Sequence, residues 1–330
     1  MLKNRESYLC LSAMLRAREG KLLNAERAAR MIEAPSYEDA ARMLTDCGYE
    51  DMSQLNAGQL EEALTAHRAD IFSELDRLAP DSLIPGIFKM KYDYHNAKVL
   101  LKSEVMQLSA DRILSATGRI APAELKRLYH EEKYSEMPGK LGKAMEEAKE
   151  LLARTANPQQ ADFALDRAFF AEMHAAAAES GNAFLQGYAK VLTDAANLKG
   201  AVRTVRMGKG QDFMKDVLIP GGSVSTDRIL AASDAEALAS LFTHSELEEA
   251  AQLGGEALTG GTLTAFELAC DNAVNTYLGR AKLVSFGSEP LTAYLAAVEN
   301  EITAVRMILT GRLAGIKPGV LKERLRDMYA

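Results

Sequence analysis

Two polar patterns recur three times along the chain, in the same order, and this repetition restricts the possible fold more than any other feature of the sequence. The first is an acidic residue followed by arginine at the start of an apolar segment. It occurs as Asp111-Arg112-Ile113-Leu114, as Asp227-Arg228-Ile229-Leu230 and, more weakly, as Glu26-Arg27-Ala28-Ala29. The second is Asp-x-x-Asn-x-Lys, which occurs as Asp93, Asn96 and Lys98, as Asp194, Asn197 and Lys199, and in degraded form as Glu301, Ala304 and Arg306. This repetition predicts three copies of one helical module, at residues 1–108, 109–210 and 211–330.

Almost every segment has the pattern of a helix. Apolar residues recur at helical spacing, and a capping residue followed by an acid predicts helix starts at Ser36, Ser233, Thr243 and Thr264. Pro122, Pro290 and Pro318 fit the first turns of helices, and Gly48 fits a helix stop. Runs of alternating β-branched residues are nearly absent, and the one short candidate, 217–225, is centred on Pro-Gly-Gly and is expected to be a loop. The sequence therefore predicts an all-α fold.

Three similar modules can be arranged in two ways. Similar packing faces allow them to surround a common pseudo-threefold axis, which would leave a central cleft or socket. Alternatively, the modules stack as a helical solenoid, because repeats need to contact only their neighbours. The sequence leaves both arrangements open.

Charge and cysteine content exclude several classes of protein. The 330 residues carry 39 basic and 46 acidic side chains, a formal charge of −7, so no nucleic-acid partner is expected. Cys10, Cys47 and Cys270 lie far apart, which argues against a disulfide framework and for a reducing, cytoplasmic setting. No apolar run approaches the ~20 residues of a membrane-spanning helix, so no transmembrane segment is predicted.

The repeated polar residues favour a structural role over a catalytic one. Asp93 and Asn96 share one face of a helix, because residues three apart are neighbours, whereas Lys98 points elsewhere. A catalytic constellation is not normally copied three times and degraded in one copy, but a buried hydrogen bond or ion pair between helices can be. We therefore expect these residues to link helices, with contact to a partner protein as the alternative.

Motifs for enzyme chemistry are missing from the sequence. No glycine-lysine pair is followed by serine or threonine, so no phosphate-binding loop is predicted. The five histidines never occur four residues apart, the spacing that places two metal ligands on one helical face. We expect no catalytic activity, no cofactor and no metal, and an enzyme using Asp93, His95 or Lys98 is the disfavoured alternative.

Three blocks of the sequence resemble signatures of the C subunit of V/A-type rotary ATPases, whose eukaryotic counterpart is known as the d subunit. They are RAREGKLL at 16–23, KYDYHNAKVLLK at 91–102, and FGSEPL at 286–291, which is followed by Tyr294 and by Glu299-Asn300-Glu301. The resemblance covers essentially the whole chain. The sequence departs from the family pattern at Ala304, where an asparagine is frequent in the family.

The resemblance implies a non-catalytic, funnel-shaped component of the central stalk. Such a component sits peripherally on the cytoplasmic face of the membrane proteolipid ring, receives the tip of the rotor shaft and couples the two for ion transport. Its partners would be the shaft subunits and the ring, and the resemblance assigns no residue to either contact. The repeats alone allow a different function, that of a soluble helical-repeat adaptor.

Overall fold

The computed structural model describes residues 3–111 and 113–330, and these residues form helices and connecting turns without any strand. The prediction of an all-α fold is therefore confirmed. The α-helices are α1 (Leu9–Glu19), α2 (Ala25–Glu33), α3 (Tyr37–Arg42), α4 (Ala57–Leu78), α5 (Leu83–Met106), α6 (Pro122–His130), α7 (Leu141–Thr155), α8 (Pro158–Ser180), α9 (Ala183–Arg206), α10 (Gln211–Val217), α11 (Thr226–Ala231), α12 (Ala235–Ser240), α13 (Glu248–Leu258), α14 (Leu263–Gly279), α15 (Ser288–Leu313) and α16 (Pro318–Lys322). Short 3-10 helices occur at Arg5–Tyr8, Thr45–Cys47, Tyr134–Glu136 and Arg280–Leu283.

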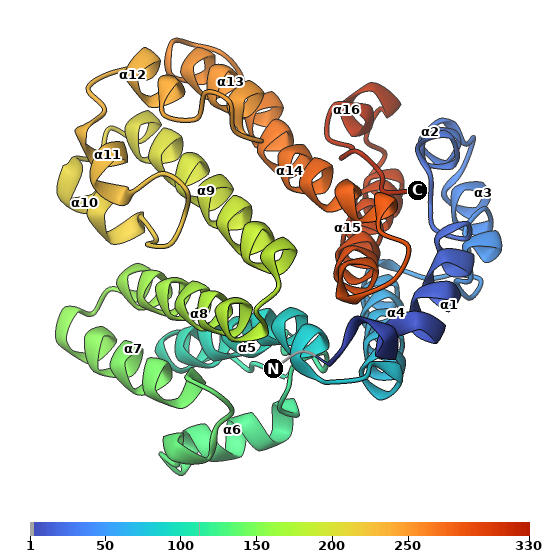
Figure 1. The fold of residues 1–330 in the computed structure, drawn as a ribbon, viewed down its shortest axis with the longest axis horizontal. Helices are drawn as coiled ribbons and strands as arrows, with labels where there is room; N and C mark the ends of the chain where they lie inside the picture. The colour runs from blue at the N-terminus through green and yellow to red at the C-terminus, as the bar shows by residue number, and fades with distance from the viewer. Residues whose placement is uncertain (1–2, 112) are drawn as a thin grey trace.

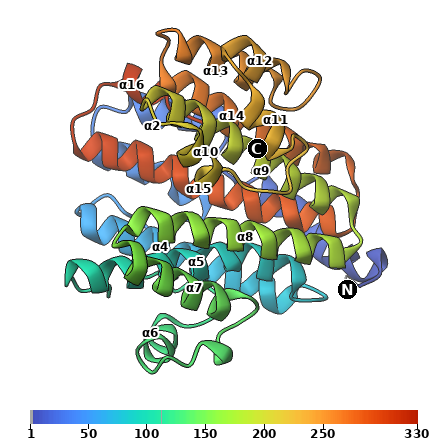
Figure 2. The ribbon, with the colours of Figure 1, turned by 90° about the vertical axis from the view of Figure 1, so that its left-hand side faces the viewer.

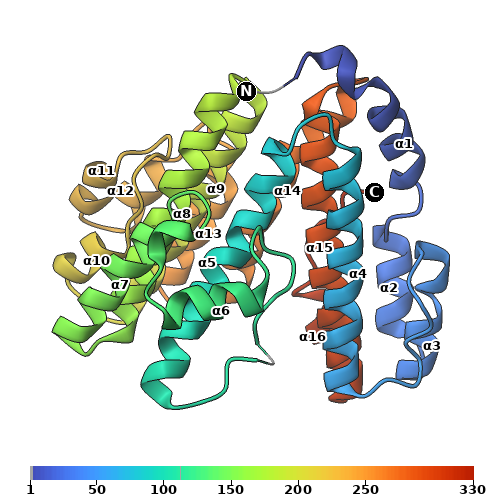
Figure 3. The same ribbon diagram turned by 90° about the horizontal axis from the view of Figure 1, so that it is seen from below.

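Three pairs of successive long helices form the frame of the molecule: α4 with α5, α8 with α9, and α14 with α15 (Figure 1). The second helix of each pair also packs on the first helix of another pair, α5 on α8, α9 on α14, and α15 on α4. The last of these contacts brings the end of the chain back to its beginning. Figures 2 and 3 show that α5, α9 and α15 run in broadly the same direction.

Two clusters of buried apolar side chains hold these helices together. The larger one extends from Tyr8 to Tyr329 and includes much of α5 and α15, so it joins both ends of the chain. The smaller one lies beneath α9, α13 and α14 and includes Phe242, Phe266 and Cys270. Cys47 lies in the larger cluster and Cys270 in the smaller one, and all three cysteines carry free thiols. Burial of these side chains is the main favourable term in the stability of the fold.

The helix boundaries agree with local signals at several points. Ser36 caps α3 by accepting a hydrogen bond from the backbone N–H of Asp39, as predicted. Pro122 and Pro318 open α6 and α16, as predicted. Gly48 ends the 3-10 turn after α3 with φ of +87°, a left-handed conformation that favours glycine.

Three predicted caps are displaced or wrong. The residue that caps α12 is Asp234 rather than Ser233. Thr243 caps no helix, because α13 begins five residues later, and the carboxylate of Glu246 binds Arg280 instead of a helix start. Thr264 lies inside α14, whose start is displaced to Leu263. A cap and an acid three residues apart form a purely local signal, and tertiary contacts override it.

The first sequence pattern also proves to be misaligned in its middle copy. Glu26 and Asp227 lie in the first turns of α2 and α11. Asp111 instead lies in the connection 107–121, whose described residues are not helical; Arg112 lies outside the described residues. The turn that corresponds to the starts of α2 and α11 is the one before α6, about ten residues further along the chain.

Candidate functional site

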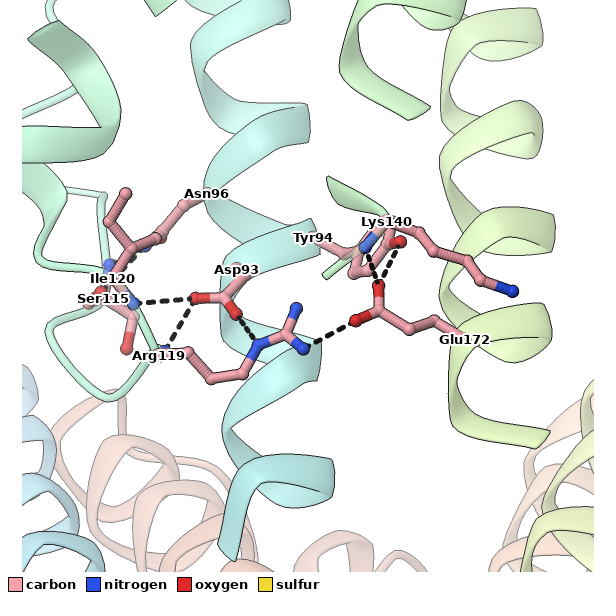
Figure 4. A network of polar contacts seen from close by, with 8 residues as sticks. All are labelled: Asp93, Tyr94, Asn96, Ser115, Arg119, Ile120, Lys140 and Glu172. Atoms are coloured by element: carbon pink, nitrogen blue, oxygen red, sulfur yellow. Dashed lines mark hydrogen bonds and ion pairs between the residues drawn. The ribbon is translucent and has the colours of Figure 1, made fainter. Parts of the chain in front are cut away.

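The acidic residues of the second pattern each bind a backbone turn that precedes a short helix. Asp93 on α5 accepts hydrogen bonds at its Oδ1 from the backbone N–H of Arg119 (2.8 Å) and, more weakly, of Ile120 (3.4 Å), just before α6 (Figure 4). Asp194 on α9 accepts from the backbone N–H of Ser223 (2.9 Å) and Val224 (3.3 Å), before α11. The long helix of each copy thus holds the start of a short helix through one carboxylate.

The third acid does the same across the two ends of the chain. Glu301 on α15 accepts a hydrogen bond from the backbone N–H of Leu23, before α2, at 2.5 Å. Its other oxygen accepts from the hydroxyl of Tyr49 at 2.8 Å. A hydrogen bond from a backbone N–H to a carboxylate therefore joins residues 278 apart in sequence here, whereas it joins residues 26 to 30 apart in the other two copies.

The link at Asp93 extends through an arginine to a second carboxylate. Arg119 donates from Nε to Asp93 Oδ2 and from Nη1 to Glu172 Oε1 of α8, both at 2.6 Å (Figure 4). Glu172 also accepts from the Tyr94 hydroxyl (2.8 Å) and from the backbone N–H of Lys140 (3.2 Å). The network connects α5, α8 and the turns before α6 and α7. Arg119 and Glu172 belong to no repeated pattern, so neither was predicted from the sequence.

Burial raises the pKa of all three acids. Asp93 is fully buried, and burial raises its pKa although Arg119 opposes this. Burial likewise raises the pKa of Asp194, against the two backbone N–H groups that it binds. Burial raises the pKa of Glu301 to about 7, although the Leu23 N–H, the Tyr49 hydroxyl and the charge of Arg27 lower it.

Two glycines allow the close approach of the carboxylates to the turns. A Cβ on Gly118 would lie 2.3 Å from Asp93 Oδ1, and one on Gly222 would lie 2.1 Å from Asp194 Oδ1. Real Cβ atoms do not approach other atoms this closely, so a side chain at either position would displace the acid. In the third copy the residue two positions before Leu23 is Lys21, and there the acid is the longer glutamate.

The amides of the second pattern clamp the same connections. Asn96 donates to the carbonyl of Ser115 and accepts from its N–H, both at 2.8 Å. Asn197 makes the same two bonds with Ile219, at 2.7 and 2.8 Å. Ala304 is buried and has no polar side-chain atom to make this pair of bonds, so the third copy lacks it.

The cations of the second pattern pair with acids on the neighbouring helix pair. Lys98 binds Asp166 of α8 at 2.5 Å, Lys199 binds Asp271 of α14 at 2.8 Å, and Arg306 binds Glu61 of α4 at 2.8 Å. These three acids were not predicted from the sequence. They occur at equal intervals, at positions 61, 166 and 271, and this regular spacing was the signal that could have revealed them.

A cavity of about 440 Å³ lies between α5, α8, α9, α14 and α15. Its wall combines aromatic and aliphatic side chains with the ion pairs just described; it includes Phe88, Phe169, Tyr188, Leu192, Lys98, Asp166, Lys199 and Asp271. His95 also lines it, with Nε2 3.3 Å from the carbonyl oxygen of Ile113. The cavity wall thus combines an apolar surface with lysines that are already paired with acids.

No group of three histidine, cysteine, aspartate or glutamate side chains in the described parts of the chain is arranged to hold a metal ion. Within the same residues, every helix is too short or too polar to cross a membrane.

Known proteins with similar sequences identify the family. The family of ATP synthase (C/AC39) subunits matches residues 11–324. The C subunit of the V-type sodium ATPase of Enterococcus hirae is 26% identical over 327 residues, which cover 98% of this chain and 99% of that protein. The C subunit of the A-type ATP synthase of Methanocaldococcus jannaschii is 24% identical, over 96% of this chain and 86% of the relative. The corresponding protein of Methanothermobacter thermautotrophicus is 22% identical, over 97% and 86%. With a match over nearly its whole length, the chain belongs to the family of C subunits of V/A-type rotary ATPases.

Proposed function

We propose that this chain is a non-catalytic subunit of the central stalk of a V/A-type rotary ATPase, where it couples the rotor shaft to the membrane proteolipid ring. The observation that carries the proposal is the family match over residues 11–324, together with relatives named as the C subunits of a V-type ATPase and of A-type ATP synthases. In this role the chain is peripheral, on the cytoplasmic face of the membrane, and the ATP chemistry belongs to other subunits.

The contacts between helix pairs suit a part that transmits torque. Such a part must resist shear between its elements, and bistable or loosely packed elements would absorb the motion instead. The second long helix of each pair, α5, α9 or α15, is tied to a neighbouring helix pair by an ion pair and to a turn by a buried carboxylate. We propose that the eight repeated polar residues act as structural links between three modules, at 1–108, 109–210 and 211–330, around a pseudo-threefold axis.

The cavity between α5, α9 and α15 is the proposed socket for the tip of the shaft. Its aromatic and aliphatic wall can bury apolar side chains of an inserted segment, which is the main source of affinity in an interface. Its lysines are already paired with acids, so an incoming segment need not neutralise buried charges. A funnel-shaped molecule with this socket would grip the shaft at one end and leave the outer surface for the ring.

Affinity purification from the native cell tests the proposal. A tagged chain, extracted in mild detergent, is expected to carry the proteolipid and shaft subunits with it. Recovery of the chain alone, or with soluble proteins only, from cells whose rotary ATPase remains intact would refute the assignment and favour an adaptor protein.

A pair of matched variants tests the socket separately. Ala196 of α9 lines the cavity, whereas Ala178 of α8 is exposed and does not line it. Ala196→Arg is expected to release the shaft subunits while Ala178→Arg retains them, with the circular dichroism of both variants unchanged. Retention of the shaft by folded Ala196→Arg would exclude this cavity as the socket.

A further inference from the structure

Two glutamates on α15 lie two residues apart in opposite electrostatic surroundings. Glu299 contacts the ammonium of Lys91 and the hydroxyl of Tyr92, with Arg68 Nε 3.8 Å away. Burial opposes its ionisation, but Lys91, Tyr92 and Arg68 outweigh burial, and the pKa of Glu299 is lowered. Glu301 is only 3% exposed, and within the described residues it forms no ion pair. Its pKa is about 7 because burial dominates.

The neighbours of Glu301 provide hydrogen bonds but no cation in contact. Leu23 N–H comes from the turn before α2, and the Tyr49 hydroxyl comes from the segment before α4. Arg27 of α2 acts on Glu301 through its charge, and its guanidinium donates to Cys47 Sγ at 3.0 Å. From α4, His67 stacks on the Tyr49 ring with centroids 4.0 Å apart, and Arg68 lies toward Glu299.

Several other charged groups on the helices that pack against α15 are paired with residues other than Glu301. These pairs are Arg16 with Glu19 and Arg18 with Glu74 on α1, Arg42 with Asp39 on α3, Lys91 of α5 with Glu299, Asp271 of α14 with Lys199, and Lys322 of α16 with Glu33. On α15 itself, burial raises the pKa of Tyr294 and the charge of Glu301 contributes to this rise, but the two side chains form no hydrogen bond. When Glu301 is ionised, its charge is therefore buried with two hydrogen bonds but no cation in contact, which is costly.

This link also lacks the support that the other two have. Asp93 and Asp194 bind turns on the same stretch of chain, 26 to 30 residues away, and an asparagine one turn further along clamps each connection. Glu301 binds a turn 278 residues away, and Ala304 replaces the clamp. Glu301 is therefore the polar link between α15 and the turn at Leu23, while further along the segment α2 and α3 pack on α15 and Arg312 donates to the Ala34 carbonyl.

We propose that Glu301 is a pH-sensitive link between α15 and the N-terminal segment 20–52. Protonated, the carboxyl group still accepts the Leu23 N–H, and its own O–H can donate to the Tyr49 oxygen, which accepts as well as donates. Ionised, the buried charge gains solvation only if the segment loosens and admits water. Loss of the proton near neutral pH thus weakens the attachment of α2 and of the Tyr49 segment. This inference concerns the fold itself and does not depend on the proposed role in a rotary ATPase.

Hydrogen exchange measured by mass spectrometry on the purified full chain tests whether Glu301 is a pH-sensitive link. After correction for intrinsic exchange rates, protection of amides in 20–24 and 47–52 is expected to fall about tenfold between pH 6 and pH 8. Opening exposes Glu301 and returns its pKa toward 4.5, so each pH unit between that value and about 7 favours the open state about tenfold, and above about 7 the effect levels off. The turn at 223–224, held by Asp194, is the internal control and is expected to keep its protection. Unchanged protection at 20–24 and 47–52 in the parent chain would overturn the proposal.

Two variants distinguish a pH-sensitive link at Glu301 from a general loss of protection in this part of the fold. Glu301→Gln cannot ionise and is expected to remove the pH dependence at both segments. Glu61→Gln disrupts the exposed ion pair with Arg306, where α15 meets α4, and should leave the pH dependence intact. A pH dependence that persists in Glu301→Gln would assign it to another group. If that variant fails to fold, the parent measurement alone still decides.

Discussion

Replacing Arg119 by methionine is the most direct test of the buried network on α5. Methionine keeps much of the length and the apolar stem of the side chain but removes the guanidinium. Asp93, with 0% exposure, and Glu172, with a side chain 8% exposed, would then lose their shared cation. Both would keep other donors, namely the backbone N–H groups of 119 and 120 for Asp93, and the Tyr94 hydroxyl and Lys140 N–H for Glu172.

The expected loss of stability follows from these contacts. Removing one partner of a buried ion pair costs about 3–5 kcal/mol, because the other charge stays buried without compensation. The remaining N–H and O–H donors reduce this cost, so we expect about 3 kcal/mol for Arg119→Met at pH 7.5. Without the guanidinium, the pKa of Asp93, which burial already raises, rises further. The deficit is therefore largest at high pH and shrinks as the pH falls and the acid becomes neutral.

Urea unfolding followed by circular dichroism at pH 7.5 and pH 5 measures both effects. Arg127→Met is the matched control, since Arg127 also bridges two acids, Glu124 and Glu131, but on the surface. It should unfold like the parent at both pH values. Combining Arg119→Met with Asp93→Asn should cost less than the sum of the single changes, because the two residues share one interaction.

An unfolding free energy for Arg119→Met within about 1 kcal/mol of the parent at pH 7.5 would contradict this expectation, because such a small loss is typical of a solvated pair. A deficit that is equal at both pH values would also contradict it. The lost stability would then come from packing of the arginine stem rather than from uncompensated carboxylates.

Three further predictions concern other links. Gly222→Ala should lower the melting temperature and cost about 1–3 kcal/mol, because its Cβ would lie 2.1 Å from Asp194 Oδ1. Gly86→Ala is the control: it has open space around the new Cβ and should be neutral or stabilise by up to about 1 kcal/mol. Equal melting temperatures of the two variants would contradict this prediction. Arg306→Ala should cost less than about 1 kcal/mol in chemical unfolding, because its pair with Glu61 is partly solvated, and a loss above about 2 kcal/mol would show that the pair is not screened. Burial raises the pKa of Glu301 from 4.5 to about 7, so about 3 kcal/mol of stability, present below pH ~4.5, should be lost as the pH rises through 7; an unfolding free energy that does not fall between pH 5 and pH 8 in the parent, relative to Glu301→Gln, would count against it.

The sequence predicted the fold class and much of the polar framework because these features are encoded locally or by repetition. Helical spacing of apolar residues, the cap at Ser36 and the prolines that open α6 and α16 depend on interactions within a few residues. The recurrence of Asp93, Asn96 and Lys98 marked equivalent positions on α5, α9 and α15 without any knowledge of their partners. The family signatures at 91–102 and 286–291 likewise lie on or beside these long helices.

Partners across space could not be read from the chain. Arg119 and Glu172 have no counterpart in the other copies, so repetition gave no indication of them. The capping pattern at Thr264 failed because a short local signal competes with packing of the whole helix. The misplaced Asp111 pattern shows the same weakness, since a four-residue resemblance does not determine where a turn lies.

By itself, then, the sequence determined that this protein is all-helical, that it carries two polar patterns three times, and that it is a member of a family of rotary ATPase subunits. Only the tertiary structure decided which segments contact one another. In it α15 packs on α4, Arg306 pairs with Glu61, 245 residues away in sequence, and Glu301 binds the backbone of Leu23, 278 residues away. The physical reason is the range of the interactions. Helix formation is settled by neighbours along the chain, whereas the charge state of a buried carboxylate depends on groups that only folding brings together.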